Sequence, residues 1–355
     1  MLEATEGMER LTYFIRRLLL VIPTFLGITL LVFGLTQFVP GGPVEQRIAQ
    51  MRGLGSGEAG AGSGTNVSIS EDQRRAIERE FGFDKPFLVR YWTWLVPDAM
   101  GMKSYSYKFN NKTVWQLIRE RFPISLTFGI AGFVLTYLIC VPLGIGKALR
   151  NGTHFDMLSS VVVLVLYAIP AFAFGMILKT LFSGTNDQFF DIFPIGGFRS
   201  ENWEELSAWE KVKDQTHHMF LPVLCYVIGN FAVLTILMKN SLLDQISQDY
   251  IRTVLAKGGT MRRAIWGHAL RNAMIPIVTG IGGILTIMFA GSVLIERVFS
   301  INGIGLLTLD AIVGRDYMVF MGVLGLTALL GLLGRIFSDF CYVLVDPRIN
   351  FGKEA

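Results

Sequence analysis

Six long apolar stretches, separated by polar connections, make up most of the chain. They cover residues 18–39, 124–145, 157–182, 219–238, 273–295 and 318–345. An α-helix needs roughly 20 residues to cross about 30 Å of hydrocarbon, and each stretch is long enough to do so. None alternates apolar and polar residues as the strands of a membrane β-barrel do. The pattern predicts an all-α integral membrane protein with six transmembrane helices and a long external loop after the first helix.

The composition agrees with a surface that faces membrane lipid. Of the 355 residues, 52% are hydrophobic and 17% are charged, whereas soluble domains average about 25% charged residues. The net charge of +4 is scattered along the chain, and without a basic tract we expect no nucleic-acid partner. Cys140, Cys225 and Cys341 lie too far apart for a CxxC metal site, so we expect them to be small residues of the membrane core.

The first apolar stretch has a second interpretation, as a cleaved signal peptide, because Arg16 and Arg17 precede it. Its apolar run is longer than the core of a signal peptide, and it leads into Pro40-Gly41-Gly42-Pro43 without a small-x-small cleavage site. We therefore expect a retained transmembrane anchor.

The distribution of Lys and Arg predicts the orientation. With a cytoplasmic N-terminus, the cytoplasmic segments would hold 13 of these residues and the short external loops five. The long loop after the first stretch holds twelve more, but long translocated segments largely ignore the positive-inside rule. We expect both termini to be cytoplasmic.

The long external loop contains two different kinds of sequence. Residues 53–66 are rich in Gly and Ser and predict a flexible linker. A helix start at 70–73 is followed by helical sequence up to Phe81, and residues 90–95 predict an aromatic-rich helix at the membrane interface. We expect a small ordered element within this loop.

The most informative connection is the loop of residues 239–272, between the fourth and fifth stretches. Apolar residues with helical spacing mark one face of a first helix, at Leu243, Ile246, Tyr250, Ile251, Val254 and Leu255. Gly258 and Gly259 then break the helix, and Thr260 can cap a second one. The second helix has its own apolar stripe, at Ile265, Trp266, Ala269, Leu270 and Ala273.

Two interpretations of this helix pair remain open on physical grounds. Small residues at its centre (Ala256, Gly258, Gly259) would let the surface of another protein approach the backbone closely. Alternatively, both helices lie on the lipid headgroups, to which their basic residues are suited.

A resemblance to a known family favours the protein partner. The segment Asp249-Tyr250-Ile251-Arg252-Thr253-Val254-Leu255-Ala256-Lys257-Gly258, followed by His268-Ala269-Leu270-Arg271-Asn272-Ala273, resembles the coupling loop of ABC-importer permeases of the dipeptide/oligopeptide/nickel branch. Further fragments fit in family order across nearly the whole chain, among them Phe122-Pro123-Ile124-Ser125-Leu126, Glu296, Arg315-Asp316-Tyr317 and Asp346-Pro347-Arg348. The length and the enlarged first loop are most similar to the Yej-type peptide importers, in the position of their B permease. Two positions depart from the family pattern. The branch usually has Ala where this chain has Val254, and Pro-Gly where this chain has Asn302-Gly303.

The resemblance implies the fold, the domains and the site. It implies a type I ABC importer transmembrane domain at residues 118–345, containing the coupling loop 239–272. Before it would come a cytoplasmic N-terminus with the first transmembrane helix (1–39) and an external loop with its small helical element (40–117), and after it a cytoplasmic tail (346–355). The residues that would contact the ATPase are Tyr250, Arg252, Thr253, Ala256, Lys257, Gly258, Gly259, Arg263 and His268.

The resemblance also implies a transport subunit of the bacterial inner membrane, not an enzyme. Its partners would be membrane lipid, a homologous second permease, an external substrate-binding protein and a cytoplasmic ABC ATPase, a fused double ATPase in the Yej-type systems. The chain has no G-x-x-x-x-G-K-[ST] phosphate loop, so we expect it to bind no cofactor and the partner to use ATP and Mg. Peptides are the first expectation for the substrate, and nickel or another small solute is the alternative.

Two other classes of protein fit the sequence less well. An ion-coupled secondary transporter is typically built from repeated halves with midplane carboxylates, which the sequence lacks. An intramembrane hydrolase would carry a motif such as H-E-x-x-H or G-x-S-x-G, and neither is present.

The polar residues inside or beside the stretches have alternative roles. We expect Lys179 to reach the membrane interface rather than line a transport path. Arg335 and Asp339, four residues apart, would pair with each other, with a pathway role as the alternative, and Glu296 would serve a pathway or helix packing. His217 and His218 have no Cys, His or carboxylate at ligand spacing, and we expect no metal site. Prolines such as Pro170 can kink the helices, and glycines such as Gly280 and Gly322 indicate close helix packing.

Overall fold

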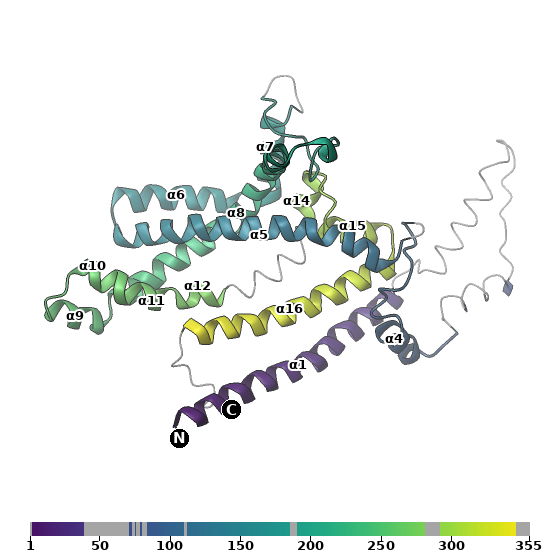
Figure 1. Ribbon diagram of the computed structural model, residues 1–355, viewed down its shortest axis with the longest axis horizontal. Coiled ribbons are helices and arrows are strands. Elements are labelled where there is room, and N and C mark those ends of the chain that lie inside the picture. Colours follow the sequence, from purple (N-terminus) through teal and green to yellow (C-terminus); the bar gives the residue numbers. More distant parts are fainter. Residues whose placement is uncertain are drawn as a thin grey trace. The chain divides into compact units, whose positions relative to one another are not determined.

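The computed structural model describes residues 2–38, 71–72, 75, 79, 84–109, 112–184, 190–280 and 292–345. In these ranges the chain is built from helices and contains no strand (Figure 1). The prediction of an all-α protein is confirmed for this part of the chain. The Gly/Ser-rich residues 53–66 and most of the predicted helix 70–81 lie outside the described residues.

Four helices in the described ranges are individually long and apolar enough to cross a membrane. They are α1 (Leu2–Phe38), α5 (Val114–Leu149), α8 (Ala208–Ile246) and α16 (Tyr317–Val345). Helices α1, α5 and α8 exceed the predicted stretches because their hydrogen-bonded turns continue into polar sequence. Helix α8 begins at a capping box, in which Ser207 Oγ accepts from the backbone N–H of Glu210 and the Glu210 carboxylate accepts from the backbone N–H of Ser207.

The third predicted stretch is divided into two helices. Helix α6 (His154–Ala168) and helix α7 (Ala171–Phe182) meet at an angle of 93°. The residue before a proline avoids the helical conformation, and Ile169 accordingly has extended angles of φ −92° and ψ 119°. The expected kink at Pro170 is confirmed, and together the two helices remain long and apolar enough for one bent span.

The fifth predicted stretch is described only at its two ends. Helix α12 (Ile275–Thr279) lies at its beginning and α14 (Val293–Val298) at its end, while residues 281–291 lie outside the described residues. Two further short helices are η1 (Trp203–Glu205) and α15 (Ile304–Val313), and the others belong to the loops after α1 and α8.

The chain divides into two compact units. The first comprises Met1–Leu20, Arg121–Leu306 and Leu330–Ala355. In it, glycines bring α5 against α8: a Cβ at Gly132 would lie 2.7 Å from the Tyr226 Cβ, and one at Gly144 2.6 Å from the Met238 Cβ. Helices α6 and α7 also contact α8. The α5–α8 pair is therefore the centre of this unit.

The second unit comprises Val21–Glu120 and Leu307–Leu329. Helix α4 (Phe87–Leu95) confirms the predicted aromatic helix, and it packs through Tyr91 and Trp94 on Phe33 of α1 and Met321 of α16. The Tyr91 hydroxyl lies 2.8 Å from the Thr29 hydroxyl. A carboxylate fixes the connection after α4, because Asp316 accepts hydrogen bonds from Ser106 Oγ and from the backbone N–H groups of residues 107 and 108.

Candidate functional site

Loop 239–272 is broken at the glycine pair, as the sequence predicts. The predicted single helix before that break is wrong, because Leu243 and Ile246 belong to the end of α8 and a turn at Ser247 and Gln248 separates them from the next helix. Helix α9 (Asp249–Ala256) precedes the break. After it come α10 (Met261–Ala264), the π-helical turn η2 (Ile265–Ala269) and α11 (Leu270–Ala273). Thr260 Oγ1 caps α10 by accepting from the backbone N–H of Arg263 at 3.3 Å. Figure 1 shows α9 at the far end of this hairpin, with α11 returning along α8.

The apolar face of the loop is packed against α5 and α8. Ile251, Ala264, Ala269 and Ala273 are buried. They belong to one cluster with Cys140 and Ala148 of α5 and with Leu234, Met238 and Leu242 of α8. Burial of these side chains fixes the loop to the two long helices. Ile251 contributes most, roughly 1.5–3 kcal/mol of hydrophobic stabilisation, and the three alanines contribute less but allow close packing.

Tyr250 is a packing residue rather than a surface residue. Its side chain is half-buried. The hydroxyl donates to Gln245 Oε1 at 2.8 Å and accepts from Asn272 Nδ2 at 3.3 Å. Nearby, Ser241 Oγ donates to the Ala273 carbonyl at 2.8 Å. Tyr250 thus joins the start of α9 to the end of α8 and to α11.

The other predicted contact residues, except Gly259, form an exposed surface. This surface contains Arg252, Thr253, Ala256, Lys257, Gly258, Arg263 and His268. Leu255, Met261 and Trp266 are also exposed, at 36%, 48% and 53%. Trp266 was expected on the packed stripe, and that expectation is wrong. Trp266 lies at the edge of the stripe, about 100° around the helix from Ile265, and Ile265 and Ala269 face inward while Trp266 does not.

The two glycines of the break have different physical roles. Gly258 has φ 80°, a backbone conformation that favours glycine, and no heavy atom lies within 4 Å of the position that a Cβ would take. Gly259 is constrained by packing, because a Cβ there would lie 2.8 Å from the carbonyl oxygen of Val254. The surface at Gly258 is therefore open to close approach by a partner.

A buried ion cluster connects α5, α6 and α8 next to this loop, and the sequence analysis missed it. Asp156 Oδ2 lies 2.7 Å from Lys239 Nζ, and Asp156 Oδ1 lies 3.1 Å from Lys147 Nζ. Lys147 also donates to the hydroxyls of Ser159 and Ser160. Lys147 and Lys239 were counted only as loop charges. The available signal was one acidic residue at a helix start between two lysines at helix ends.

Glu296 lies at a packing junction. It is 1% exposed. Its Oε1 accepts from Ser125 Oγ of α5 at 2.8 Å, and its Oε2 accepts from the backbone N–H of Leu306 at 2.7 Å. Ser125 Oγ in turn accepts from the backbone N–H of Ile304. The pair therefore caps the first turn of α15, whose N–H groups have no partner within the helix.

Two expectations for polar residues need correction, those for Asp339 and His218. Asp339 pairs with Arg17 of α1 and not with Arg335, which is exposed, because α1 brings the Arg17 guanidinium beside the carboxylate. Lys179 Nζ donates to the Val298 carbonyl at 2.7 Å and caps the end of α14, and its place at the membrane interface stays a prediction.

His218 does have a carboxylate at helical spacing, since Asp214 lies one turn before it at 3.6 Å. Ser200 Oγ contacts both side chains. Among the described residues, no group of three or more His, Cys, Asp or Glu is arranged to hold a metal ion.

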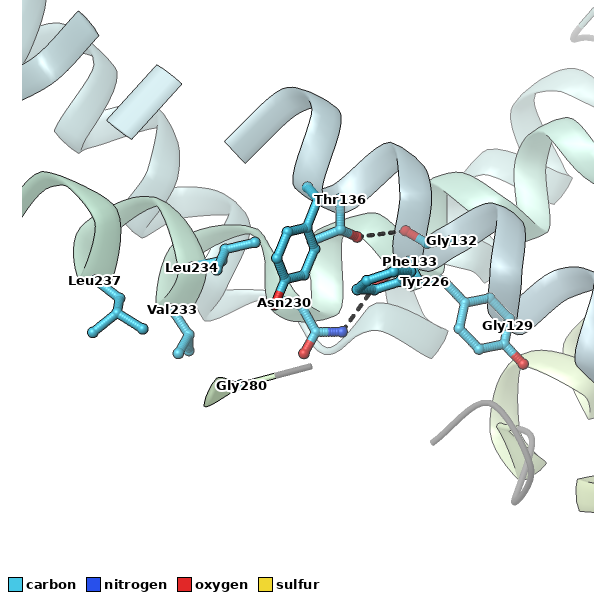
Figure 2. Close-up of a pocket in the computed structure, with 11 residues that line it drawn as sticks. Gly129, Gly132, Phe133, Thr136, Tyr226, Asn230, Val233, Leu234, Leu237 and Gly280 are labelled. Atoms are coloured by element: carbon cyan, nitrogen blue, oxygen red, sulfur yellow. Dashed lines mark hydrogen bonds between the residues drawn. The ribbon is translucent and has the colours of Figure 1, made fainter. Parts of the chain in front are cut away.

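A pocket with a volume of about 180 Å³ opens between α5 and α8 (Figure 2). Its lining residues are Gly129, Gly132, Phe133, Thr136 and Tyr137 of α5, Tyr226, Asn230, Val233, Leu234 and Leu237 of α8, and Gly280. The lining is mainly apolar and holds no ionisable carboxylate, amine, imidazole or thiol. The sequence analysis did not identify this pocket, because it depends on which faces of two distant helices meet.

Comparisons with known proteins cover both the loop and the pocket. The family described as "Binding-protein-dependent transport system inner membrane component" matches residues 140–351. "Inner membrane ABC transporter permease protein YejB" of Escherichia coli O157:H7 is 41% identical over 96% of this chain and 98% of its own length. "Peptidoglycan transport system permease protein YejB" of Agrobacterium fabrum is 38% identical over 96% and 99%. "Dipeptide transport system permease protein DppB" of Escherichia coli (strain K12) is 33% identical over 97% and 100%.

Proposed function

The chain belongs to the family of binding-protein-dependent transport system inner membrane components, and from this premise we propose that it is a permease subunit of an ATP-binding-cassette importer for peptides. The observation that carries the proposal is the exposed, small-residue surface at Ala256–Gly258, held on a loop whose other face is packed against the long helices. A docking site that transmits force needs both properties.

The proposed mechanism uses this loop as a rigid connection. A cytoplasmic ATPase would contact the exposed side of α9 and α10. Because the loop shares its buried cluster with α5 and α8, a displacement of α9 would be passed to those helices rather than absorbed by a mobile segment. The ion cluster at Asp156 would extend the motion to α6. Closure of the ATPase would in this way reorient the helices that enclose the substrate path.

The finer organisation of the importer is part of the proposal. We propose six transmembrane helices of the type I importer arrangement, with residues 118–345 as the permease domain and both termini in the cytoplasm of a bacterial cell. A homologous second permease would complete the path, and a binding protein would deliver the substrate from outside. ATP and Mg would be bound by a separate ATPase, in one fused chain or two.

Peptides are proposed as substrate because the printed names of two relatives refer to dipeptide and peptidoglycan transport. Free peptides and the peptide part of peptidoglycan fragments share the same backbone chemistry. Nickel is the less favoured alternative. The pocket between α5 and α8 offers no imidazole, thiol or carboxylate, the usual protein ligands of such a metal.

The test is uptake by proteoliposomes that contain this chain, its second permease and the ATPase, with the binding protein outside and ATP inside. Labelled tri-alanine, a labelled muramyl tripeptide and ⁶³Ni²⁺ form separate arms. We expect ATP-dependent uptake in a peptide arm and none when the ATPase is omitted. Uptake driven by an ion gradient without the ATPase, or uptake confined to the nickel arm, would contradict the proposal.

A further inference from the structure

The pocket between α5 and α8 contains one polar group that the protein leaves largely unused. The Asn230 side chain is exposed. Its single hydrogen bond within the described part of the chain is a long one, from Nδ2 to the Tyr226 carbonyl at 3.4 Å. One amide N–H and the carbonyl oxygen of Asn230 are therefore available to a ligand. Figure 2 shows this amide among the side chains of α5 and α8.

The other polar groups of the pocket are already committed. Thr136 Oγ1 donates to the Gly132 carbonyl at 2.7 Å. The Tyr137 hydroxyl donates to the Ile277 carbonyl at 3.0 Å, and the Tyr226 hydroxyl accepts from the backbone N–H of Ser292 at 3.0 Å. Asn230 is thus the group through which the pocket can pair with a polar ligand.

The depth of Asn230 argues against a lipid-facing role. It lies within the apolar stretch 219–238, and at 1.5 Å per helical residue it is about 12 Å or more from either end. An amide without partners in hydrocarbon is costly to bury. The position of an exposed asparagine at this depth is explained if the pocket around it contains water or a polar ligand.

The shape of the pocket fits part of an extended chain. Glycines at 129, 132 and 280 line it, and Gly132 allows the close approach of α5 and α8 that forms its wall. The volume of about 180 Å³ is below the roughly 300–1,000 Å³ of sites that enclose a whole drug-sized ligand. A pocket of this size can form one side of a substrate path whose other side is supplied by a second permease. It would hold a short piece of the substrate at a time.

We propose that this pocket is a contact site for the backbone of the transported peptide, with Asn230 pairing the N–H and C=O of one residue. In an extended chain these two groups point to the same side, so the carboxamide can donate to the C=O through its nitrogen and accept from the N–H through its oxygen. A hydroxyl, which has a single oxygen, or a charged group does not reproduce this two-atom pairing. Phe133, Tyr137 and Val233 provide an apolar wall for side chains of varied kind. The absence of a fixed charge in the lining suits substrates of differing net charge. This inference rests on the proposed function of the chain as a peptide permease.

The first test uses the complete importer in proteoliposomes and the labelled peptide that the wild type takes up, tri-alanine or muramyl tripeptide. Asn230→Leu removes the amide and keeps similar volume. We expect the rate of uptake from saturating, loaded binding protein to fall about tenfold, the size of effect expected when the hydrogen bonds of the amide are lost. ATPase stimulation by loaded binding protein should be unchanged, and Asn230→Gln should recover most of the uptake. Unchanged uptake by Asn230→Leu would overturn the site alone, whereas no peptide uptake by the wild type would overturn the proposed function as well.

The second test measures access of water and substrate to the pocket. In the assembled importer, with Cys140, Cys225 and Cys341 replaced by alanine, single cysteines are introduced at Val233 and at Leu164. These residues are similarly exposed, at 61% and 57%, but Leu164 lies on α6 outside the pocket. We expect a charged, membrane-impermeant thiol reagent to modify Val233→Cys and not Leu164→Cys, with protection by excess peptide. Equal inertness of the two, or labelling of Val233→Cys that peptide does not slow, would show that the pocket faces lipid or the second permease.

Discussion

At the scale of single residues, Asp156 determines how three helices meet. Asp156 lies in the first turn of α6 and forms ion pairs with Lys239 of α8 and Lys147 of α5. The side chains of Lys147 and Asp156 are only 2% and 9% exposed. Two lysines so close together are tolerated because one carboxylate lies between them, and removal of that carboxylate would leave two buried charges with no counter-charge.

We therefore expect Asp156→Asn to destabilise the protein by about 3–5 kcal/mol, the usual loss when one partner of a buried pair is removed. The matched control is Glu120→Gln, which removes one partner of the exposed pair with Lys112, whose side chains are 47% and 52% exposed. That variant should lose about 1 kcal/mol or less. Thermal unfolding of the purified chain in detergent measures both. Equal midpoints for the two variants would mean that the cluster does not stabilise the helix packing.

At the scale of elements, the break between α9 and α10 separates packing from recognition. The buried side of the pair holds the loop on α5 and α8, and the exposed side contributes little to the fold. A substitution on the exposed side can then affect contact with a partner without affecting the packing. Gly258 is the clearest position for such a change, because its Cβ position meets no neighbour.

Gly258→Asp should leave the protein inserted and folded but uncouple ATP hydrolysis from uptake, because the new side chain would stand on the docking surface. Aspartate adopts positive φ more readily than most residues, so the backbone strain is modest. Gly152→Asn is the control, since Gly152 has φ 77° and an equally open Cβ position in the α5–α6 connection. A neutral side chain is used there because the Gly152 N–H donates to Asp156, which a new carboxylate would repel. We expect uptake to fall at least tenfold in the first variant and to stay near the wild-type value in the second. Normal transport by Gly258→Asp at normal expression would refute the docking surface.

A helix or a break could be predicted from the sequence where it depends on a property of a single segment. Apolar length indicated α1, α5, α8 and α16, and the glycine pair with Thr260 indicated the break in loop 239–272. The aromatic helix α4 was predictable for the same reason. Pro170 indicated a kink but not an angle of 93°, because the bend depends on how α6 and α7 pack on α8.

Contacts between distant segments were not predictable in this way. Asp339 has Arg335 one turn away on its own helix, yet it pairs with Arg17, which is 322 residues away in the chain. The pairing of Asp156 with Lys239 and the pocket around Asn230 likewise require knowing which helix faces meet. Trp266 was misplaced because it lies at the edge of its apolar stripe, where the spacing alone does not decide which side is packed.

At the scale of the whole molecule, the number of membrane crossings decides whether the proposed mechanism is possible. In the described residues, four helices qualify as single spans, and five if α6 and α7 form one bent span. With five crossings the two termini would lie on opposite sides of the membrane. The docking loop and both termini share the cytoplasmic side only if the stretch 273–295 also crosses, which makes six.

Residues on either side of that stretch should therefore be accessible from opposite sides of the membrane. Single cysteines at Ser247, which is exposed between α8 and α9, and at Val313, which is 74% exposed at the end of α15, are suitable in a chain without its native cysteines. In intact spheroplasts an impermeant maleimide should label Val313→Cys and a control at Ser56 in the long loop, and should label Ser247→Cys only after the membrane is permeabilised. Labelling of Ser247→Cys and Val313→Cys from the same side would mean that residues 273–295 do not cross. If both were labelled in intact spheroplasts, the loop would lie outside, where it could not contact a cytoplasmic ATPase, and the coupling mechanism would have to be abandoned even if the exposed surface at Gly258 were confirmed.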